Sequence, residues 1–590
     1  MDPIKVDFSK KDSGGKKDIV IPPEKAALKI ILSILCMVIF AAVTFYVMLP
    51  AMNFKSYDFY IYIGLVAASY VVFNGIFTNV MNKPEYIPYV KKRAIVPGII
   101  IALLIATVGV GYLVSCEFFR AESYSQIIDV KTNANFSEEI EEQNAESFSA
   151  IPKLDEEAAA QLATRALGVL EEKGYVSQFT VYPEYTQINY KETPVRVAPL
   201  QYANIIKWFT NTKNGFPGYV IIDMANESTE FIEVENGIKY SPAEHFNKLL
   251  KRHLRFEYPT FMFADATFEI DDEGNPYWIC ARLDKTIGLF GGTDVIGAVV
   301  VNADSATGES KYYTIDEIKD SEELQWLDRI YDSDLIVQQY NFYGKYQNGF
   351  WNSILGQRDV ITTTANYNYI AKDDDVWMYT GVTSVTSDQS ITGFVLVNQR
   401  TKEANYYRVT GGTEYSAQQA AEGRVKDLGY DATFPLLLNI GGEPTYFLSL
   451  KDDSNIVQQY ALINVAQYNN NKMGATGTDL SKCLASYVAA LKESGIKVDI
   501  DPDAVVDPST KPSDEPSVDA LTVSGTIADI RTAVISGNSY YYIKLDSNAA
   551  YFSVSASKNE TVVILNKGDS VTVTYSGEGA IIDAESIKLN

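Results

Sequence analysis

The chain has 590 residues and a net charge of −25, and a single hydrophobic core does not organise that length. Residues 117–590 hold 68 of its 75 acidic residues and 38 of its 50 basic ones, a net charge of about −30 for this part. Such a surface repels phosphate backbones, so we expect no nucleic-acid partner.

Three charge-free apolar stretches come first, at residues 30–49, 59–82 and 94–116. Each has at least the roughly 20 residues that span a hydrocarbon core. The first stretch is too long for a cleaved signal peptide, and no cleavage site separates it from the second. The sequence therefore predicts three transmembrane helices within residues 25–116.

Basic residues predict how these helices are oriented. The first 29 residues carry seven lysines and residues 83–93 carry four basic residues, whereas residues 50–58 carry only Lys55. Because cytoplasmic segments hold the excess of lysine and arginine, residues 1–24 are predicted to be a cytoplasmic tail. The chain after Cys116 is then extracytoplasmic, and the protein is expected in a cell membrane.

The three stretches are interpreted as an anchor. They contain no ionisable residue, and Asn74 and Asn79 are the strongest polar groups in the second. A transporter or channel normally carries charges or a polar pathway in its helices. Gly98, Gly109 and Gly111 in the third stretch would permit close helix contact, so a homo-oligomer formed through the helices is one expectation.

Residues 117–175 are predicted to form a polar, acidic stalk followed by a helix at 155–174. The apolar face of this helix would comprise Leu154, Ala158, Leu162, Ala166, Val169 and Leu170. From about residue 176 the sequence changes to short aromatic and β-branched strands.

An internal duplication is the most informative pattern in this part. Residues 218–223 match 393–398, residues 237–244 match 412–419, and residues 268–278 resemble 438–447. Residues 297–302 and the tyrosines that follow resemble 393–407, and the pentapeptide at 336–340 returns at 456–460. Ser241 and Ser416 each precede Glu or Gln by three residues, which predicts two capped helices.

These matches predict two copies of an α+β module, at residues 176–330 and 331–495, each with a helix packed on an antiparallel sheet. The order of helix, strand, turn and aromatic strand resembles PepSY-type modules of bacterial envelope proteins. That resemblance implies an envelope-facing, non-catalytic module of a type linked to protease regulation.

A further helix is predicted at 479–495, with Leu480, Leu484, Val488 and Leu491 on one face. Residues 496–518 are rich in Pro, Ser and Asp and are predicted to be an extended linker. Residues 519–590 are predicted to be a small all-β barrel with strands at 521–530, 540–545, 551–554, 562–565, 570–575 and 581–589. This tail resembles bacterial OB-like barrels, which implies a fold only.

Motifs in the sequence predict no catalytic, cofactor-binding or metal-binding residues. His245 and His253 lack a metal-binding spacing, no serine lies in a Gly-x-Ser-x-Gly pattern, and Gly291-Gly292 and Gly411-Gly412 are expected to be turns. The series Asp499, Asp501, Asp503 begins like a calcium loop but lacks the required glycine and glutamate. The acidic turns at 271–273 and 373–375 are the better calcium candidates, although solvated hairpin tips explain them equally well.

Cysteine usage and tyrosine content add two expectations. Cys280 and Cys483 are expected to be buried thiols, although one disulfide is an alternative. So few cysteines in so large an extracytoplasmic part are typical of a Gram-positive bacterium. Tyrosine pairs such as Tyr312-Tyr313 and Tyr406-Tyr407 suit strands, and they also suit protein or glycan interfaces.

The leading hypothesis is a membrane-anchored cell-envelope protein with a non-catalytic binding or scaffolding region. Its partner would be an envelope protein or a wall polymer. The alternatives are an envelope hydrolase that uses clustered carboxylates and an envelope sensor that signals through the lysine-rich tail.

Overall fold

The computed structural model describes residues 20–169, 174–386, 389–506, 521–535, 538–555, 559–575, 579 and 581–589. It divides into a unit of residues 1–506 and a unit of residues 507–590. Most of the predicted cytoplasmic tail and most of the predicted linker lie outside the described residues.

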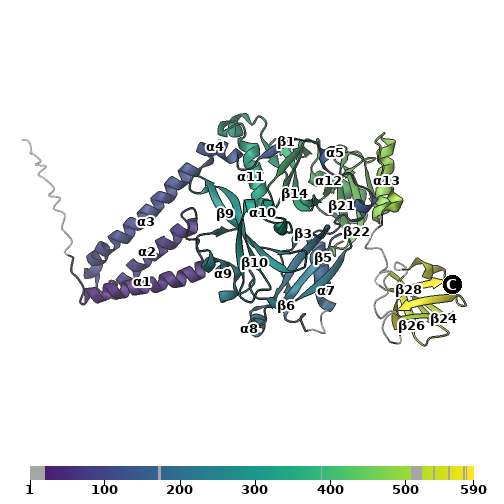
Figure 1. Ribbon diagram of the computed structural model, residues 1–590, viewed down its shortest axis with the longest axis horizontal. Helices are drawn as coiled ribbons and strands as arrows, with labels where there is room; N and C mark the ends of the chain where they lie inside the picture. The colour runs from purple at the N-terminus through teal and green to yellow at the C-terminus, as the bar shows by residue number, and fades with distance from the viewer. Residues whose placement is uncertain are drawn as a thin grey trace, which may run out of the picture. The chain divides into compact units, whose positions relative to one another are not determined.

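Three long apolar helices lie near the N-terminus (Figure 1): α1 (Ala26–Met48), α2 (Tyr57–Thr78) and α3 (Ile87–Ser115), the last preceded by the short helix η1 (Pro84–Tyr86). All three are long and apolar enough to cross a membrane. Helix α2 packs against both α1 and α3, and Asn74 Nδ2 of α2 donates to Ser33 Oγ of α1 at 3.4 Å. The bundle is therefore a candidate three-helix membrane anchor.

One end of this bundle is attached to residues 117–506, which we call the α+β region. Leu49 O accepts from Arg255 Nε at 3.1 Å, and Met52 N donates to Pro259 O at 2.8 Å. At the end of α3, Ser115 Oγ accepts from the backbone N–H groups of Leu289 and Phe290 at 2.8 and 2.9 Å. The connection between α1 and α2 thus lies on the same side of the bundle as the α+β region.

Four sheets follow one another in the α+β region, and their strands are connected in the same order. In each sheet the first two strands both pair with the third, and the third, fourth and fifth form an antiparallel meander. Sheet 1 contains β2 (Phe179–Val181), β3 (Thr186–Tyr190), β4 (Thr193–Tyr202), β5 (Phe216–Asp223) and β6 (Ser228–Ile238). Sheet 2 contains β7 (Met262–Phe263), β8 (Thr267–Ile270), β9 (Pro276–Ile287), β10 (Gly291–Asn302) and β11 (Ser310–Thr314).

Sheets 3 and 4 repeat this order. Sheet 3 contains β12 (Ile361–Thr363), β13 (Asn368–Lys372), β14 (Asp375–Ser384), β16 (Gly393–Asn398) and β17 (Ala404–Tyr407), and β1 (Val130–Ala134) extends it parallel to β17. Sheet 4 contains β19 (Asp431–Ala432), β20 (Leu436–Ile440), β21 (Glu443–Lys451), β22 (Val457–Asn464) and β23 (Gly474–Gly477). The short strands β15 (Ser390–Ile391) and β18 (Gly411–Gly412) pair separately.

A helix precedes each sheet: α7 (Glu156–Val169), α9 (Leu250–Glu257), α11 (Ser333–Tyr346) and α12 (Glu414–Arg424). Other helices are α4 (Glu117–Ser125), α5 (Phe136–Glu139), α6 (Ala145–Ser149), α8 (Ile205–Asn211), α10 (Ile315–Asp320) and α13 (Leu480–Glu493). Short helical turns are η3 (Phe246–Lys248), η4 (Glu322–Leu324), η5 (Asn352–Gly356) and η6 (Pro502–Ala504). In α13 all four residues of the predicted apolar face are buried.

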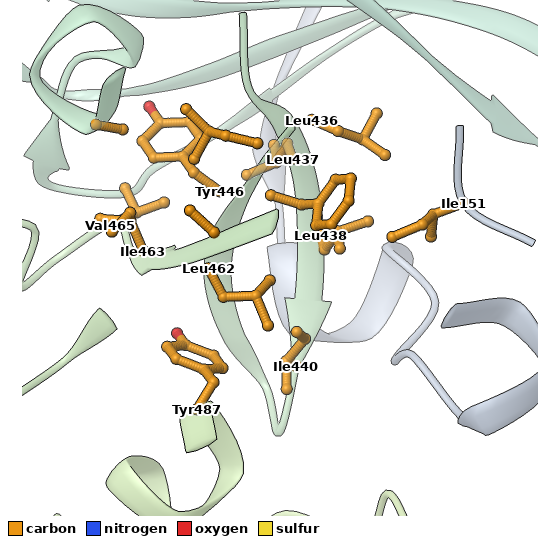
Figure 2. Packing of buried hydrophobic residues seen from close by; sticks show 14 of the residues in the cluster. Ile151, Leu436, Leu437, Leu438, Ile440, Tyr446, Leu462, Ile463, Val465 and Tyr487 are labelled. Atoms are coloured by element: carbon orange, nitrogen blue, oxygen red, sulfur yellow. The ribbon is translucent and has the colours of Figure 1, made fainter. Parts of the chain in front are cut away.

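Alternation along the strands places a hydrophobic core between each pair of consecutive sheets. In β9, Trp278 and Cys280 pack toward sheet 1, whereas Ile279 and Ala281 pack toward sheet 3. Sheet 3 does the same between sheets 2 and 4. Figure 2 shows part of the last core, in which Tyr487 of α13 and Ile151 lie near leucines of β20 and β22. Sheets 2 and 3 are apolar on both faces for this reason.

The predicted stalk belongs to these cores. Phe136, Ile140 and Phe148 of residues 117–150 are buried against sheets 3 and 4. The helix predicted at 155–174 is observed as α7 up to Val169, and residues 170–173 lie outside the described part. Leu154 and Ala158 of the predicted face are buried, as are Ala159, Ala163 and Leu167, whereas Leu162 and Ala166 are half-buried. The stalk prediction was wrong because a few large apolar residues are enough to dock a polar segment.

Both predicted serine caps are wrong. No helix begins at Ser241, which forms an isolated bridge with Leu249. Ser416 lies inside α12, and the cap is Thr413, whose Oγ1 accepts from Ser416 N at 3.2 Å. A capping-box pattern marks candidate N-termini only, and here the helix begins three residues earlier, so that Thr413 accepts from the N–H of Ser416.

Three of the predicted matches fall on equivalent strands. Residues 297–302 and the tyrosines that follow lie in β10 and β11, as 393–407 lies in β16 and β17. Residues 218–223 and 393–398 lie in β5 and β16, the fourth strands of sheets 1 and 3. Residues 268–278 and 438–447 lie in the β8–β9 and β20–β21 hairpins of sheets 2 and 4. Each predicted copy thus holds two sheets, and the single helix-on-sheet module was too coarse a prediction. The division into copies at 176–330 and 331–495 stays a prediction.

The pentapeptide match is a coincidence of sequence. Residues 336–340 lie in α11, whereas Val457–Tyr460 of the second occurrence lie in β22. A short run such as Ile-Val-Gln-Gln-Tyr is compatible with both states, and its tertiary surroundings decide between them.

The predicted linker begins too early. Val498, Ile500 and Val505 are buried in the core of sheet 4 and α13, and Val506 N donates to Ser149 Oγ at 3.1 Å. The expectation that residues 499–518 lack apolar content to pack therefore fails for the part before residue 507.

The second unit contains β24 (Leu521–Ile535), β25 (Asn538–Leu545), β26 (Tyr551–Ser555), β27 (Ser570–Tyr575) and β28 (Ile581–Leu589). They pair in the order β24-β25-β26-β28-β27, and β27 also pairs with β24. Residues 562–565, predicted as a strand, lie instead in and just after the 3-10 helix η8 (Glu560–Ile564). The OB-like resemblance stays a prediction.

Candidate functional site

The candidate site begins with a buried arginine in β4. Val195 and Val197 pack in the core between sheets 1 and 2, so Arg196 lies on the opposite face of the strand. Gln187 of β3 lies directly across from it, and both side chains are buried, Arg196 with 7% of its surface exposed. Buried arginine is rare unless a partner neutralises it, so its surroundings decide its role.

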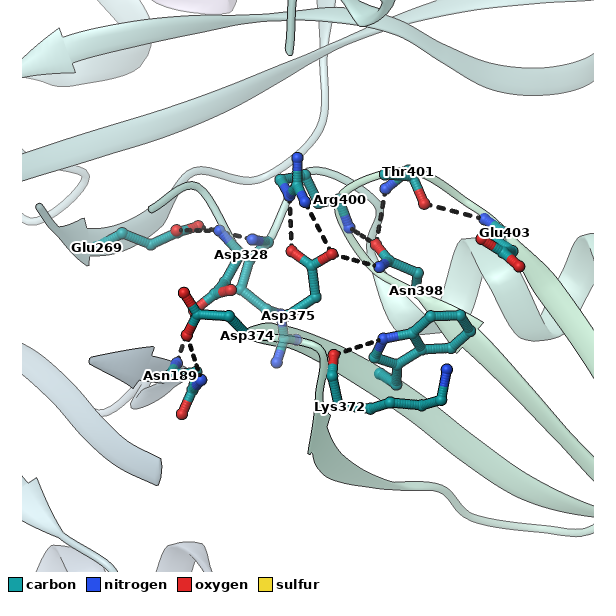
Figure 3. A network of polar contacts seen from close by, with 12 residues as sticks. Asn189, Glu269, Asp328, Lys372, Asp374, Asp375, Asn398, Arg400, Thr401 and Glu403 are labelled. Carbon is teal, nitrogen blue, oxygen red and sulfur yellow. Dashed lines mark hydrogen bonds and ion pairs between the residues drawn. The ribbon is translucent and has the colours of Figure 1, made fainter. Parts of the chain in front are cut away.

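A second arginine reaches the same place from the segment before α11. The backbone N–H groups of Asp328 and Arg329 donate to the two carboxylate oxygens of Glu269 at 2.8 and 3.1 Å. Asp328 Oδ2 accepts from Asn189 N at 2.6 Å. Figure 3 shows Glu269 beside Asp328, with Asp374 next to Asn189. These contacts fix the segment and hence the position of the Arg329 side chain.

Both arginines line a cavity of about 310 Å³, which we call the arginine cavity. Its walls come from sheets 1, 3 and 4 and from the segment before α7. Five aromatic side chains contribute: Tyr185, Tyr367, Tyr369, Phe434 and Phe447. A concave cavity that combines aromatic rings with convergent polar groups, here two arginines and a glutamine, is suited to a small ligand.

Neither guanidinium is fully paired. Arg196 forms an ion pair with Glu156 at 3.7 Å, and Arg329 Nη2 donates to Tyr369 Oη at 2.9 Å. The Nε atoms of Arg196 and Arg329, and Gln187 Oε1, are buried without a hydrogen-bond partner among the described residues. Such groups carry a desolvation cost that an added partner would relieve.

Burial lowers the pKa of Arg196, and the charge of Arg329 lowers it further against the opposing effect of Glu156. For Arg329, burial acts to lower the pKa, but its contacts with Tyr369 raise it overall. The guanidinium groups of Arg196 and Arg329 thus line the same cavity away from water, where an anion that binds between them would be strongly favoured.

Two of the acidic residues near the cavity bind a lysine, and the third, Glu156, is the partner of Arg196. Asp155 and Glu157 bind Lys451 Nζ at 2.5 and 3.2 Å, and Glu156 is largely exposed. Because Glu156 is largely exposed and 3.7 Å away, it offsets the charge of Arg196 only in part. Arginine binds carboxylate and phosphate groups through parallel N–H bonds, so the site is suited to holding an acidic group.

Sequence analysis missed these residues, although one signal was present. Arg196 interrupts the apolar run Val195-Arg196-Val197-Ala198, where an arginine has to be buried. Arg329 gives no such signal, because a loop before a helix commonly carries charge and only the fold brings it to Arg196.

The structure brings the two predicted acidic turns together elsewhere. Asp271, Asp272, Glu273 and Asp374 line a separate cavity of about 490 Å³. Burial and the charge of Asp272 raise the pKa of Asp374. Among the described residues, however, no group of three or more His, Cys, Asp or Glu side chains is arranged to hold a metal ion.

Other predicted residues have structural roles. His245 contacts the ring of Trp208, and His253 of α9 lies 2.8 Å from Gly308 O. Cys280 and Cys483 are separate buried thiols. Asp501 caps η6, which accounts for one acid of the calcium-like series.

The glycines of α3 also differ from expectation. Beside Gly98 and Gly109, no described atom would lie within 4 Å of an added side-chain carbon. Gly111 instead accommodates Phe290 of the α+β region. Helix contact through Gly98 and Gly109 stays a prediction about an oligomer.

Comparison with protein-family models, curated proteins and solved structures gives no match for this chain.

Proposed function

We propose that this is a membrane-anchored cell-envelope protein whose α+β region lies outside the cytoplasm and binds the acidic end of a chain in the arginine cavity. The ligand would belong to an envelope protein or a wall polymer and would carry a terminal carboxylate or phosphate. The supporting observation is that Arg196 and Arg329, both unsatisfied at Nε, line one aromatic cavity.

Two features support the wider setting. The lysine-rich connection at residues 83–93 joins the ends of α2 and α3 that lie away from the α+β region, which agrees with a cytoplasmic side there (Figure 1). The order of helix, hairpin and meander in each sheet supports a repeated, PepSY-like envelope module, now proposed as four units. An OB-like tail after residue 519 completes this proposal.

The rival hydrolase lacks comparable support. Both carboxylate oxygens of Glu269 accept backbone N–H groups, and Asp375 forms a bidentate ion pair with Arg400 (Figure 3). Carboxylates engaged in this way hold the structure together and are not free to activate water.

Substitution of Arg196 by methionine separates a binding role from a structural one. Methionine keeps the volume and removes the buried charge, so we expect thermal stability to stay the same or rise. Affinity for an acidic probe should fall by roughly ten- to a hundredfold, because a charge-assisted pair is lost. Calorimetric titration of the full chain in nanodiscs would use N-acetyl-dialanine and glycerol 3-phosphate, with the carboxamide of the dipeptide as neutral control.

Arg424 provides the matched variant. Its Nε also lacks a partner among the described residues, but it lies outside the arginine cavity. Arg424→Met should leave binding unchanged. Equal binding of the acid and the amide, failure of both acidic probes to bind, or a lowered melting temperature for Arg196→Met would contradict the proposal.

A further inference from the structure

An exposed apolar surface lies where the third long helix enters the α+β region. Phe118 and Phe119 of α4 follow Ser115, the last residue of α3, by three and four residues. Because each residue spans at most about 3.6 Å, the backbone of both residues lies within roughly 14 Å of the end of α3. The surface therefore continues directly from a candidate membrane span.

A segment more than two hundred residues away completes this surface. Phe350 and Trp351 pack edge-on against Phe118, with ring centroids 5.0 and 5.8 Å apart. Beyond them, Ile354 and Leu355 of η5 point outward. The exposed fractions are 65% for Phe119, 62% for Trp351 and 77% for Leu355. We call Phe118, Phe119, Trp351, Ile354 and Leu355 the apolar wedge.

Polar contacts hold the wedge from behind. Asn352 Nδ2 donates to Arg358 O at 2.9 Å, and Ser353 Oγ donates to Phe350 O at 2.7 Å. Phe350 packs against the small core of α4 and α11 that contains Tyr346. Residues 350–356 contain no charged residue. The segment is thus fixed in place and presents only its apolar tip.

We propose that the apolar wedge inserts into the membrane leaflet on the side of the α+β region, beside the three spans. The argument is its continuity with α3 and its composition, since tryptophan and other aromatics are enriched where a protein crosses the membrane–water interface. At the same end of the bundle, Phe54 of the connection between α1 and α2 and Tyr57 at the start of α2 are exposed and extend this aromatic belt. The inference is independent of the ligand of the arginine cavity.

Quenching by brominated lipids tests this insertion. Leu355→Cys would be labelled with bimane in the full chain, with Cys36 and Cys116 replaced by serine because Cys280 and Cys483 are buried. The protein is reconstituted into phosphatidylcholine nanodiscs with acyl chains brominated near the headgroup. We expect quenching close to that at Val110→Cys, which is exposed on α3, and at least threefold above that at Lys426→Cys in the α+β region.

Each outcome bears on the proposal. An unchanged melting temperature of labelled Leu355→Cys in detergent would show that the variant folds. Quenching at Leu355 no greater than at Lys426 would place the wedge in water and overturn the proposal. A disulfide-linked dimer of the unlabelled Leu355→Cys variant, together with no quenching of the labelled one, would show that a second copy covers the surface. That result would overturn the proposal as well.

Discussion

Single buried charges set the balance between stability and binding in this protein. Arg196 occupies a strand position where valine or leucine would stabilise the fold, and its partner Glu156 is largely exposed and 3.7 Å away. Residues that oppose stability in this way are concentrated at functional sites. The same reasoning separates it from Arg400, whose charge is neutralised by Asp375 at 2.6 Å.

Glu269 should make stability depend on pH. Burial raises its pKa to about 7, against the opposing hydrogen bond from Asp328 N and the charge of Arg329. Between about pH 4.5 and 7 the unfolded chain has released a proton that the folded chain still holds. The free energy of unfolding should therefore fall by about 3 kcal/mol as pH rises through this window, and level off above it.

Unfolding of the full chain in non-ionic detergent, followed at several pH values, would measure this effect. Glu269→Gln should remove much of the decline, whereas Glu138→Gln on the exposed surface of α5 should not. Because burial and Glu269 also raise the pKa of Asp328, part of the decline should remain. A pH profile unchanged by Glu269→Gln would show that another group controls it.

Thr413 should be the cap that sequence patterns assign to Ser416. Its Oγ1 satisfies the N–H of Ser416 and also contacts Ser416 Oγ at 2.9 Å. We expect Thr413→Ala to destabilise the chain by about 1 kcal/mol and Thr413→Ser to retain most of that. Thermal melts of the two variants would decide the matter, and equal losses would argue against a capping role.

At the scale of elements, a two-residue turn between the second and third strands recurs in three of the four sheets. Lys191-Glu192, Asp373-Asp374 and Gly441-Gly442 occupy it in sheets 1, 3 and 4, and all six residues have positive φ. Two-residue turns of this kind match the twist of the strands and favour Asn-Gly. Of these three turns, only the one in sheet 4 consists of glycines, so the turns of sheets 1 and 3 carry some backbone strain.

Replacing Lys191-Glu192 by Asn-Gly should therefore stabilise the protein, by roughly 0.5–1 kcal/mol, because both residues then accept positive φ at low cost. A higher melting temperature of the full chain would support this. The reciprocal change, Gly442→Lys in sheet 4, should lower it. No change in either direction would mean that the turns are not strained.

The sequence predicted the positions of the strands better than it predicted how the strands group into sheets. Residues 218–223 and 393–398 were matched correctly as equivalent strands, because a glycine and a continuous apolar run mark them in both places. Sequence could not show that the strands form four sheets, since a strand that is buried on both faces looks the same whichever sheet it joins. The arginine cavity was out of reach for a related reason, because its two arginines are 133 residues apart.

At the scale of the whole molecule, charge and apolar length predicted more than motifs did. The ends of the first two predicted spans lie within four residues of those of α1 and α2, because charge-free stretches of that length have one common explanation. Helix α3 begins seven residues before the third predicted span, since it includes the basic residues at 91–93. The predicted bounds of the stalk and the linker were wrong, because a polar composition was taken to mean an exposed segment. The segments at 117–150 and 498–505 are both polar overall, and both dock through a few buried apolar residues.

The end of the α+β region can be located by truncation. Val498, Ile500 and Val505 bury their side chains in the core of sheet 4 and α13, which should contribute about 5 kcal/mol in total. A chain ending at Val506 should keep the main thermal transition of the full protein. One ending at Gly495 should lose much of its stability, since whole domains are stable by only about 5–15 kcal/mol. Residues 507–590, expressed alone, should melt cooperatively, because Ile543, Phe552 and Val573 belong to a core of their own. If the chain ending at Gly495 melted like the one ending at Val506, the buried residues 498–505 would add nothing to the fold, and the boundary would lie where composition alone had put it.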